Sequence, residues 1–285
     1  MAGITHRDTW LRWRRAALLI SLDDGQSWQE AGPTAAPAVL GSTRTGLGVA
    51  SALIWDEANS LDVAVLHAGM ALSSATPEAV LGGANAALVG DELLQFRTAA
   101  PLGEGIYRLS GLLRGRRGTE WAIQTHVAGE SFVLIEQDSL AFLDIPAGTA
   151  QVRVIAAGIA DPEPSEQRQQ HPGRGILPIA PVHIRANVLA NGDTEIGWVR
   201  RGRAGWRWLD GVDAPLAEEV ERYRVALTPG GGPERVFEQS DARYTYSAAD
   251  PAADRARGAQ TLRVEICQVG NFGLSRPAAI TLSLT

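Results

Sequence analysis

Apolar and polar residues alternate in short runs along most of the chain, a pattern typical of β-strands rather than helices. Leu61–His67, for example, alternates with a period near two. Because successive side chains of a strand point to opposite faces, this alternation predicts a strand with one buried face. Similar runs recur through the first half of the chain, at Ala16–Leu22, Ala86–Val89, Glu92–Phe96, Ile106–Leu113, Phe132–Glu136 and Gln151–Ala156. Their spacing favours a β-barrel or a β-sandwich.

Helical signals are few. Thr76 precedes Pro77, and Gly82 follows five residues later, which predicts a short helix with Thr as N-cap and Gly at its end. Leu216–Glu221 is predicted to form one or two further helical turns. The fold class expected from these patterns is mainly β.

A change in composition divides the chain. The stretch Asp161–Gly175 contains no aliphatic or aromatic side chain, so it cannot contribute to a core and is predicted to be an exposed loop or linker. Alternation resumes at Val182, after two closely spaced prolines. We therefore expect a β-rich domain over residues 1–160, a linker over 161–180 and a second domain over 181–285.

The second domain shows an ordered series of features. Trp198 lies in an early strand, Tyr223 begins a Tyr-x-Val strand, and a closing hairpin carries Gly273 and Ser275. This order resembles the fibronectin type III β-sandwich. The resemblance implies that Trp198 and Tyr223 face each other in the core, and Cys267 is expected to be a small buried apolar residue.

Composition and charge remove many functions from consideration. All 26 basic residues are arginine, which excludes chemistry that needs a lysine amine. The formal net charge of −6 disfavours specific nucleic-acid binding. A single cysteine and scattered histidines indicate no zinc cage, and His126 is expected to be structural. The sequence therefore predicts no catalytic residue, no cofactor and no metal site. No apolar run is long enough to cross a bilayer, and no signal peptide is expected.

Acidic residues occur in two informative patterns. The series Ser21, Asp23, Gly25, Ser27 and Trp28 matches an Asp-box, which predicts a turn held by side-chain hydrogen bonds rather than a catalytic site. Elsewhere carboxylates stand side by side. Adjacent residues of a strand point to opposite faces, so these pairs do not by themselves supply the two facing carboxyl groups of a glycosidase. The pairs are Asp23-Asp24, Asp56-Glu57, Asp91-Glu92 and Glu218-Glu219.

One dense stretch, Gly82–Glu120, carries the segments VGDELLQF and LLRGRRGTE. Together with HVAGE at 126–130, WVRRGR at 198–203 and EEVERYRV at 218–225, it resembles the tail-tip protein of gene transfer agents and related long-tailed phages, called the megatron protein in gene transfer agents. The resemblance covers the carboxyl-terminal part of those proteins and nearly all of this chain. The TIM-barrel-like region of the long family members, a candidate cell-wall hydrolase, has no counterpart here.

The resemblance implies a structural role. It suggests a β-rich hub domain with a fibronectin-like module, assembled as a homotrimer around the tail axis and contacting other tail-tip or baseplate proteins. The location expected is the tail tip of a virion whose parts are made in the bacterial cytoplasm. No enzymatic role is transferred from the family to this chain.

Arginine clusters are the candidate subunit contacts, because the planar guanidinium binds carboxylates in a bidentate manner. Contact between subunits, a solvated loop and contact with DNA in a tail channel are the three interpretations, and net charge opposes the last. We favour subunit contact. The candidate residues are Arg114, Arg116, Arg117, Arg200 and Arg201.

Two other functions compete with assembly. Trp206 and Trp208 in the segment GWRW would offer indole faces on which a host-surface polysaccharide could stack, although a loop folded onto its own domain explains them as well. A hydrolase acting on the cell wall or on glycans is the third and least favoured reading.

Overall fold

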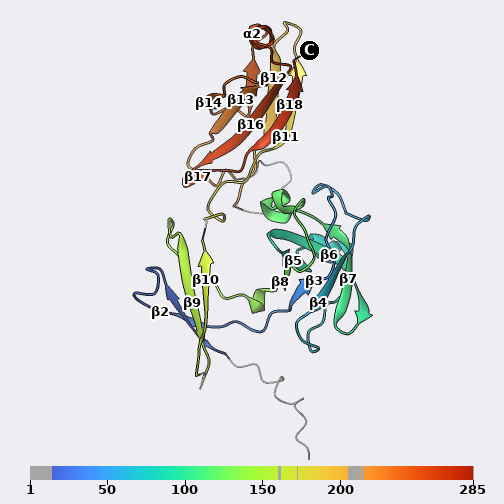
Figure 1. The fold of residues 1–285 in the computed structure, drawn as a ribbon, viewed down its shortest axis with the longest axis vertical. Helices are drawn as coiled ribbons and strands as arrows, with labels where there is room; N and C mark the ends of the chain where they lie inside the picture. Colours follow the sequence, from blue (N-terminus) through green and yellow to red (C-terminus); the bar gives the residue numbers. More distant parts are fainter. Residues whose placement is uncertain (1–14, 160–161, 172, 205–212, 214, 285) are drawn as a thin grey trace, which may run out of the picture. The chain divides into compact units, whose positions relative to one another are not determined.

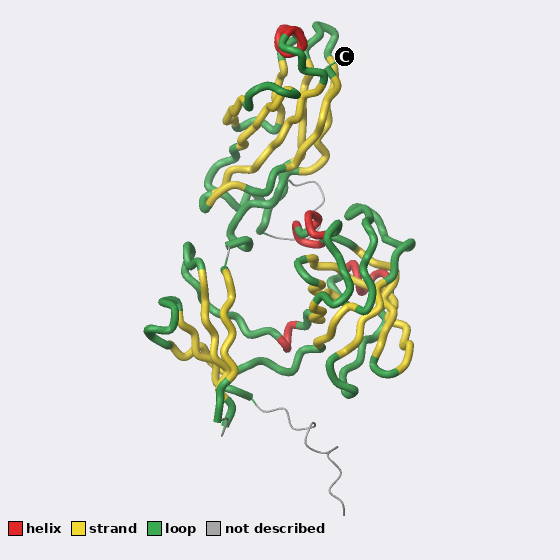
Figure 2. Tube along the Cα trace, viewed as in Figure 1, coloured by secondary structure: helices red, strands yellow, loops and turns green. Residues whose placement is uncertain are grey.

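The computed structural model describes residues 15–159, 162–171, 173–204, 213 and 215–284 (Figure 1). The chain divides into two compact units. The first unit comprises residues 1–172 and the second residues 173–285. Strands make up most of the regular structure in both units, and the helices are short (Figure 2). The prediction of a mainly β protein is confirmed.

A closed antiparallel barrel forms the larger part of the first unit. Its strands follow one another around the barrel in the order β3-β4-β7-β6-β5-β8. Five of the six strands coincide with predicted alternating runs. Because their apolar residues alternate with polar ones, these strands can all turn an apolar face inward. The strands are β3 (Leu40–Thr43), β4 (Leu61–Val65), β5 (Ala86–Val89), β6 (Glu92–Gly103), β7 (Ile106–Leu113) and β8 (Ser131–Leu134).

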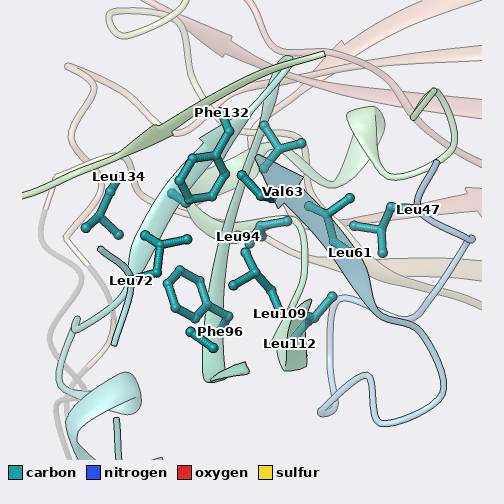
Figure 3. Close-up of a cluster of buried hydrophobic side chains, with 13 residues drawn as sticks. Leu47, Leu61, Val63, Leu72, Leu94, Phe96, Leu109, Leu112, Phe132 and Leu134 are labelled. Carbon is teal, nitrogen blue, oxygen red and sulfur yellow. The ribbon is translucent and has the colours of Figure 1, made fainter. Parts of the chain in front are cut away.

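The barrel interior is a packed apolar core, with side chains from several strands pointing toward one another (Figure 3). Leu94 and Phe96 come from β6, Leu109 from β7 and Phe132 from β8, and none of these four is exposed. Burying side chains of this size contributes about 1.5–3 kcal/mol each to folding. A barrel also leaves no open sheet edge, so short strands suffice to hold it together.

A four-stranded sheet completes the first unit, in the order β10-β9-β1-β2. Residues 17–21 pair with residues 153–157, so the barrel sequence is inserted between the two halves of this sheet. The strands are β1 (Ala17–Ser21), β2 (Gln29–Pro33), β9 (Gln151–Ala157) and β10 (Ser165–Gln170).

Strand β10 corrects the linker prediction. Ser165–Gln170 pairs along its full length with β9, although all six residues are exposed. A strand at a sheet edge needs backbone hydrogen bonds to one neighbour but no apolar face, and this is why its polar sequence resembled a linker. The first unit consequently extends past residue 160, and the division falls after residue 172 rather than near 180.

The Asp-box forms the predicted turn between β1 and β2. The hydroxyl of Ser21 donates to Asp23 Oδ1 at 2.8 Å, and the Gly25 N–H donates to Ser21 Oγ at 2.7 Å. Ser27 donates to Asp23 through both its N–H and its hydroxyl. These hydrogen bonds, led by that from the Ser27 hydroxyl, lower the pKa of Asp23 to about 2. Trp28 is half-buried, and the Cζ atom of Arg153 lies over its ring, 5.6 Å from the ring centroid.

The short helices agree with the sequence in one case and differ in two. Helix α1 (Pro77–Leu81) is capped by Thr76, whose hydroxyl accepts from the Ala79 N–H, as predicted. The helical turns predicted at 216–221 are wrong, because this stretch contains only bends and residues without regular secondary structure. Helix α2 (Ala249–Ala256) was not predicted. It carries little apolar sequence and is held by Asp254, which is buried and accepts from Tyr246 Oη and Arg235. The remaining helical segments are single 3₁₀ turns: η1 (Arg116–Gly118), η2 (Glu120–Ala122) and η3 (Gln137–Ser139).

The second unit is a sandwich of two antiparallel sheets, one ordered β11-β12-β15 and the other β14-β13-β16, with β17 and β18 also paired to β16. Leaving out the two-residue β17, strands β11, β12 and β15 form one sheet, and strands β13, β14, β16 and β18 form the sheet that faces it. This is the strand order of the fibronectin type III sandwich, which confirms the prediction. The strands are β11 (Val182–Val188), β12 (Thr194–Val199), β13 (Tyr223–Pro229), β14 (Arg235–Gln239), β15 (Arg243–Tyr246), β16 (Thr261–Gly270), β17 (Gly273–Leu274) and β18 (Ala278–Ser283).

The core of the sandwich contains the predicted aromatic pair. The rings of Trp198 and Tyr223 meet edge to face, with centroids 5.1 Å apart. The Tyr223 hydroxyl donates to Glu221 at 2.6 Å at the margin of the core. Cys267 is buried as a free thiol, as expected.

Candidate functional site: the charged end of the barrel

Three chain connections close one end of the barrel. They join β3 to β4 (residues 44–60), β5 to β6 (90–91) and β7 to β8 (114–130). Because all neighbouring strands are antiparallel, these connections lie at the same end. Ionisable side chains from the connections and the adjoining strand end meet there, and we call this group the charged end. Its members are Asp56, Glu92, Arg114, His126 and Glu130.

Arg114 is the centre of the charged end. Its Nε and Nη2 both donate to the Glu92 carboxylate, at 2.9 Å to Oε1 and 2.9 Å to Oε2 respectively. Its Nη1 donates to Asp56 Oδ2 at 3.0 Å and to the carbonyl of Gly48 at 2.9 Å. The guanidinium is fully buried, so its charge is compensated by these partners instead of by water. The residue thereby joins the 44–60 connection to the start of β6.

His126 bridges two carboxylates. Its Nε2 lies 2.5 Å from Glu92 Oε2, and its Nδ1 lies 2.8 Å from Glu130 Oε2. Since each ring nitrogen faces a carboxylate oxygen, the geometry fits an imidazolium that donates on both sides. The hydrogen bond to Glu92 raises the pKa of His126, against the opposing effect of burial. The bond to Glu130 acts in the same direction.

Glu92 accepts hydrogen bonds from several donors. Besides Arg114 and His126, the Gly115 N–H donates to Oε1 at 2.6 Å. Burial alone would raise the pKa of Glu92, but these donors outweigh it and hold the pKa below its usual value. Gly115 has a φ of +57°, and a Cβ there would come within 2.8 Å of the Glu120 Cα. Glycine is therefore required at this turn.

The arrangement is suited to holding loops in place. The side chains of Glu92 and Arg114 are fully buried and engaged with one another, and His126 is 1% exposed. The 44–60 connection is fastened at Gly48, at Asp56 and by the paired backbones of Asp56 and Leu112. Within the described ranges, no group of three or more His, Cys, Asp or Glu side chains is placed to hold a metal ion.

The loop fixed in this way presents apolar side chains to solvent. Val49, Leu53 and Ile54 are 67%, 72% and 67% exposed. Nearby on the same connection, Trp55 lies under the Arg97 guanidinium, which also pairs with Glu57 at 2.9 Å. A loop fastened at several points that exposes aliphatic side chains offers a surface suited to protein contact, since apolar surface gains most from being covered.

The structure corrects one predicted contact residue. Arg114 was predicted to reach a neighbouring subunit, but its side chain is enclosed by Glu92 and Asp56 of its own barrel. The chain turns inward after β7, and the two carboxylates compensate the charge there. Arg116 is half-buried and donates to Gln95 Oε1 at 2.9 Å, while Arg117 is exposed with a φ of +53°. Subunit contact by these two arginines stays a prediction.

The other predicted residues lie in the second unit. Arg200 pairs with Asp213 at 2.6 Å, and Arg201 donates to the Ala180 carbonyl at 2.7 Å. Both therefore have partners within their own unit, and their role as subunit contacts is untested. Trp206 and Trp208 lie outside the described residues, so their predicted contact with a polysaccharide also stays a prediction.

The sequence pattern did not reveal the carboxylates of the charged end. Asp56 and Glu92 were seen only as members of adjacent acidic pairs. In the structure each is the buried member of its pair, and Glu57 and Asp91 are exposed, as the alternation of side chains predicts. Their convergence on Arg114 joins residues 22 and 58 positions away along the chain. No local pattern could show this.

These features define a class: a protein whose described residues form a six-stranded β-barrel closed by buried ion pairs, followed by a fibronectin type III-like sandwich. Residues 38–133 match the model of a protein family described as Rcc01698-like, C-terminal. The matched segment coincides with the barrel, from just before β3 into β8. No curated protein matches the chain.

Solved structures similar to the chain include two proteins with tandem domains. One is the extracellular region of rat CD45, domains d3-d4, with 11% identity over 52% of this chain and 72% of that one, and a TM-score of 0.27. The other is a segment of two fibronectin type III domains from chicken tenascin, with 13% identity over 85% and 99%, and a TM-score of 0.26. Because these scores are low, the assignment of the second unit is based on its own strand order. No helix in the described part of the chain is long and apolar enough to span a membrane.

Proposed function

We propose that this chain is a structural component of the tail tip or baseplate of a phage or gene transfer agent. This proposal is supported by the match of the barrel to the Rcc01698-like C-terminal family. The name of that family is related to gene transfer agents. The resemblance of the VGDELLQF and LLRGRRGTE segments points the same way, and both segments lie within the matched range. On this proposal the chain acts by assembly, as a homotrimer around the tail axis, and not by catalysis.

The observation that carries the proposal of assembly through protein contacts is the charged end of the barrel. Arg114 there fastens the 44–60 connection through its ion pair with Asp56 and its hydrogen bond to the Gly48 carbonyl, and that connection exposes Leu53 and Ile54. A preorganised loop loses little conformational entropy when it is covered by another protein, which favours a permanent contact. We infer that this loop, with the neighbouring Arg116 and Arg117, contacts an adjacent subunit or tail protein.

Particles that carry an epitope-tagged copy of the chain test the location. Immunogold electron microscopy should place the label at the tail tip, and particles without the protein should lack a functional tip. Label found only in the host cytoplasm, or full infectivity without the protein, would contradict the proposal. So would turnover of peptidoglycan by the purified chain.

Charge substitutions test the contact surface. Leu53→Asp with Ile54→Asp, and separately Arg116→Glu with Arg117→Glu, should reduce the fraction of particles with complete tips. Leu102→Asp is the matched control, because Leu102 is 50% exposed but lies where β6 approaches the opposite end of the barrel. Normal tips and infectivity in both double variants, with circular dichroism showing folded protein, would remove the loop and the arginines from the contact.

A further inference from the structure

The outer face of the three-stranded sheet β11-β12-β15 carries an open groove with a volume of about 560 Å³. In the central strand β12, Ile196 and Trp198 point into the core, so Gly197 between them faces outward. Gly197 pairs with Arg185 of β11 on one side and with Arg243 of β15 on the other. The groove thus has a glycine at its centre and an arginine on each flank.

Gly197 leaves space above the sheet. No atom lies within 4 Å of the position that a Cβ would occupy there. Glycine in the middle of a strand weakens the sheet, and it often marks a place where a ligand approaches the backbone closely. Strands lie about 4.8 Å apart, so the Cα atoms of Arg185 and Arg243 are separated by roughly 10 Å, and both long side chains can reach a group placed over Gly197.

Neither of the two arginines forms an ion pair within the part of the chain that the structure describes. Among the described residues, neither the Arg185 nor the Arg243 side chain has a hydrogen bond or an ion pair, and both residues are exposed. By contrast, Arg153 and Arg168 on the exposed sheet of the first unit are paired with Glu166 and Asp24. Two unpaired guanidinium groups facing one open position suit a carboxylate, which each can bind in a bidentate manner.

A second row of polar groups lies two residues further along the strands. Asn187 of β11 pairs with Glu195 of β12, and both line the groove. An amide and a carboxylate together donate to and accept from hydroxyl groups. Glu195 and Asp241, which also lines the groove, would repel a continuous run of negative charges. The ligand that fits therefore has a carboxylate at one point and hydroxyl groups beside it.

The strand at the groove's edge is also distorted. The register of β11 against β12 shifts between Val182 and Arg185, and His183 at this bulge has a φ of +53°. Non-glycine residues seldom adopt such a φ, and bulges commonly re-aim a side chain beside a binding site. Here the bulge adds His183 to the lining of the groove.

We propose that this groove binds an acidic polysaccharide, with the carboxylate of a uronic acid held over Gly197 between Arg185 and Arg243. Hydroxyl groups of the sugar bind Asn187 and Glu195. This goes beyond the assembly function proposed above and does not involve Trp206 or Trp208. An acidic peptide is the less suitable ligand, because it offers few hydroxyl groups and its successive charges would meet Glu195 and Asp241.

Isothermal titration calorimetry of the full chain with an oligogalacturonate at low salt tests the proposal. We expect saturable binding that Arg185→Gln and Arg243→Gln each weaken by about tenfold or more, since each removes a charge-assisted contact. Gly197→Val should abolish binding without unfolding the sheet, because there is room for the side chain and valine favours strands. Arg263→Gln, at a 56% exposed arginine of the other sheet, should bind like the parent chain.

The ligand controls separate charge from sugar. The methyl-esterified oligomer, which keeps the hydroxyl groups but loses the charge, should bind at least about tenfold more weakly. Absence of oligogalacturonate binding would overturn the proposal, as would binding unchanged by Gly197→Val in protein whose circular dichroism is that of the parent. Equal or tighter binding of polyglutamate would overturn it in favour of an acidic peptide.

Discussion

Arg114 and Glu92 form an ion pair in which neither side chain is exposed, with Nη2 and Oε2 2.9 Å apart. Such a pair adds little net stability compared with apolar residues, but it is costly to break, because the remaining charge stays buried. The position of this ion pair in the barrel explains its structural role. It ties the beginning of β6 to the segment after β7 and, through Asp56, to the exposed 44–60 connection.

Removing Arg114 should destabilise the barrel strongly. Arg114→Met leaves Glu92 and Asp56 without their main counter-charge, and we expect a loss of about 3–5 kcal/mol in the free energy of unfolding. Urea unfolding, monitored by hydrogen exchange of the backbone amides in β6 and β7, measures this loss. Arg108→Met is the control: Arg108 pairs with Asp62 but is 52% exposed, so about 1 kcal/mol or less is expected. Equal effects of the two substitutions would refute the assigned role of Arg114.

The stability of the barrel should decrease as the pH rises through the raised pKa of His126. The pKa of His126 is raised in the folded protein, so its stabilising contribution is complete below the ordinary value of 6.5 and is lost as pH rises through the higher folded value. Glu92 and Glu130 face the ring directly, and Arg114 and Asp56 complete the network. The unfolding free energy of the barrel, measured between about pH 6 and pH 9, should show this decrease. A His126→Gln variant should not show it, and an identical pH profile in that variant would contradict the prediction.

The Asp-box turn should persist in acid. Asp23 has a pKa of about 2, so the turn's hydrogen bonds to its carboxylate are present above the ordinary value of 3.8 and are lost as pH falls through about 2. Carbon-13 NMR of the Asp23 carboxyl group measures this pKa directly. Ser27→Ala removes the largest stabilising hydrogen bond and should raise the pKa toward its ordinary value. An unchanged pKa in Ser27→Ala would show that the Ser27 hydroxyl is not its main cause.

The aromatic pair should dominate the stability of the sandwich. Trp198→Ala removes a ring that packs on Tyr223 in the core, and a loss of about 3–5 kcal/mol is expected from the cavity and the lost burial. Thermal unfolding of the second unit, monitored by hydrogen exchange of the backbone amides in β13 and β16, measures this loss of stability. Phe272→Ala is the matched control, since Phe272 is 55% exposed and should change stability by about 0.5 kcal/mol or less. A small effect at Trp198 would mean that the ring is not part of the core.

Local patterns predicted most of the strands because a strand's alternation is written in consecutive residues. Ile106–Leu113 was predicted with the bounds that the structure shows, and the Thr76 cap of α1 was also recognised locally. By contrast, β10 was missed, because an exposed edge strand is defined by its neighbour β9 and not by an apolar face. Helix α2 was missed for a related reason, since its anchor is the contact of Asp254 with Tyr246 and Arg235.

The β class, the fibronectin-like order of the second unit and the absence of lysine chemistry follow from the amino-acid sequence alone, because each depends on residue type or short-range spacing. Which charges are buried and which face solvent depends instead on how the chain folds. Arg114 and Arg185 are the same residue type, yet one is enclosed by carboxylates from distant parts of the chain and the other faces solvent beside a glycine. The burial and partners of a charge depend on chain segments brought together by folding, and these govern both its pKa and its capacity to bind.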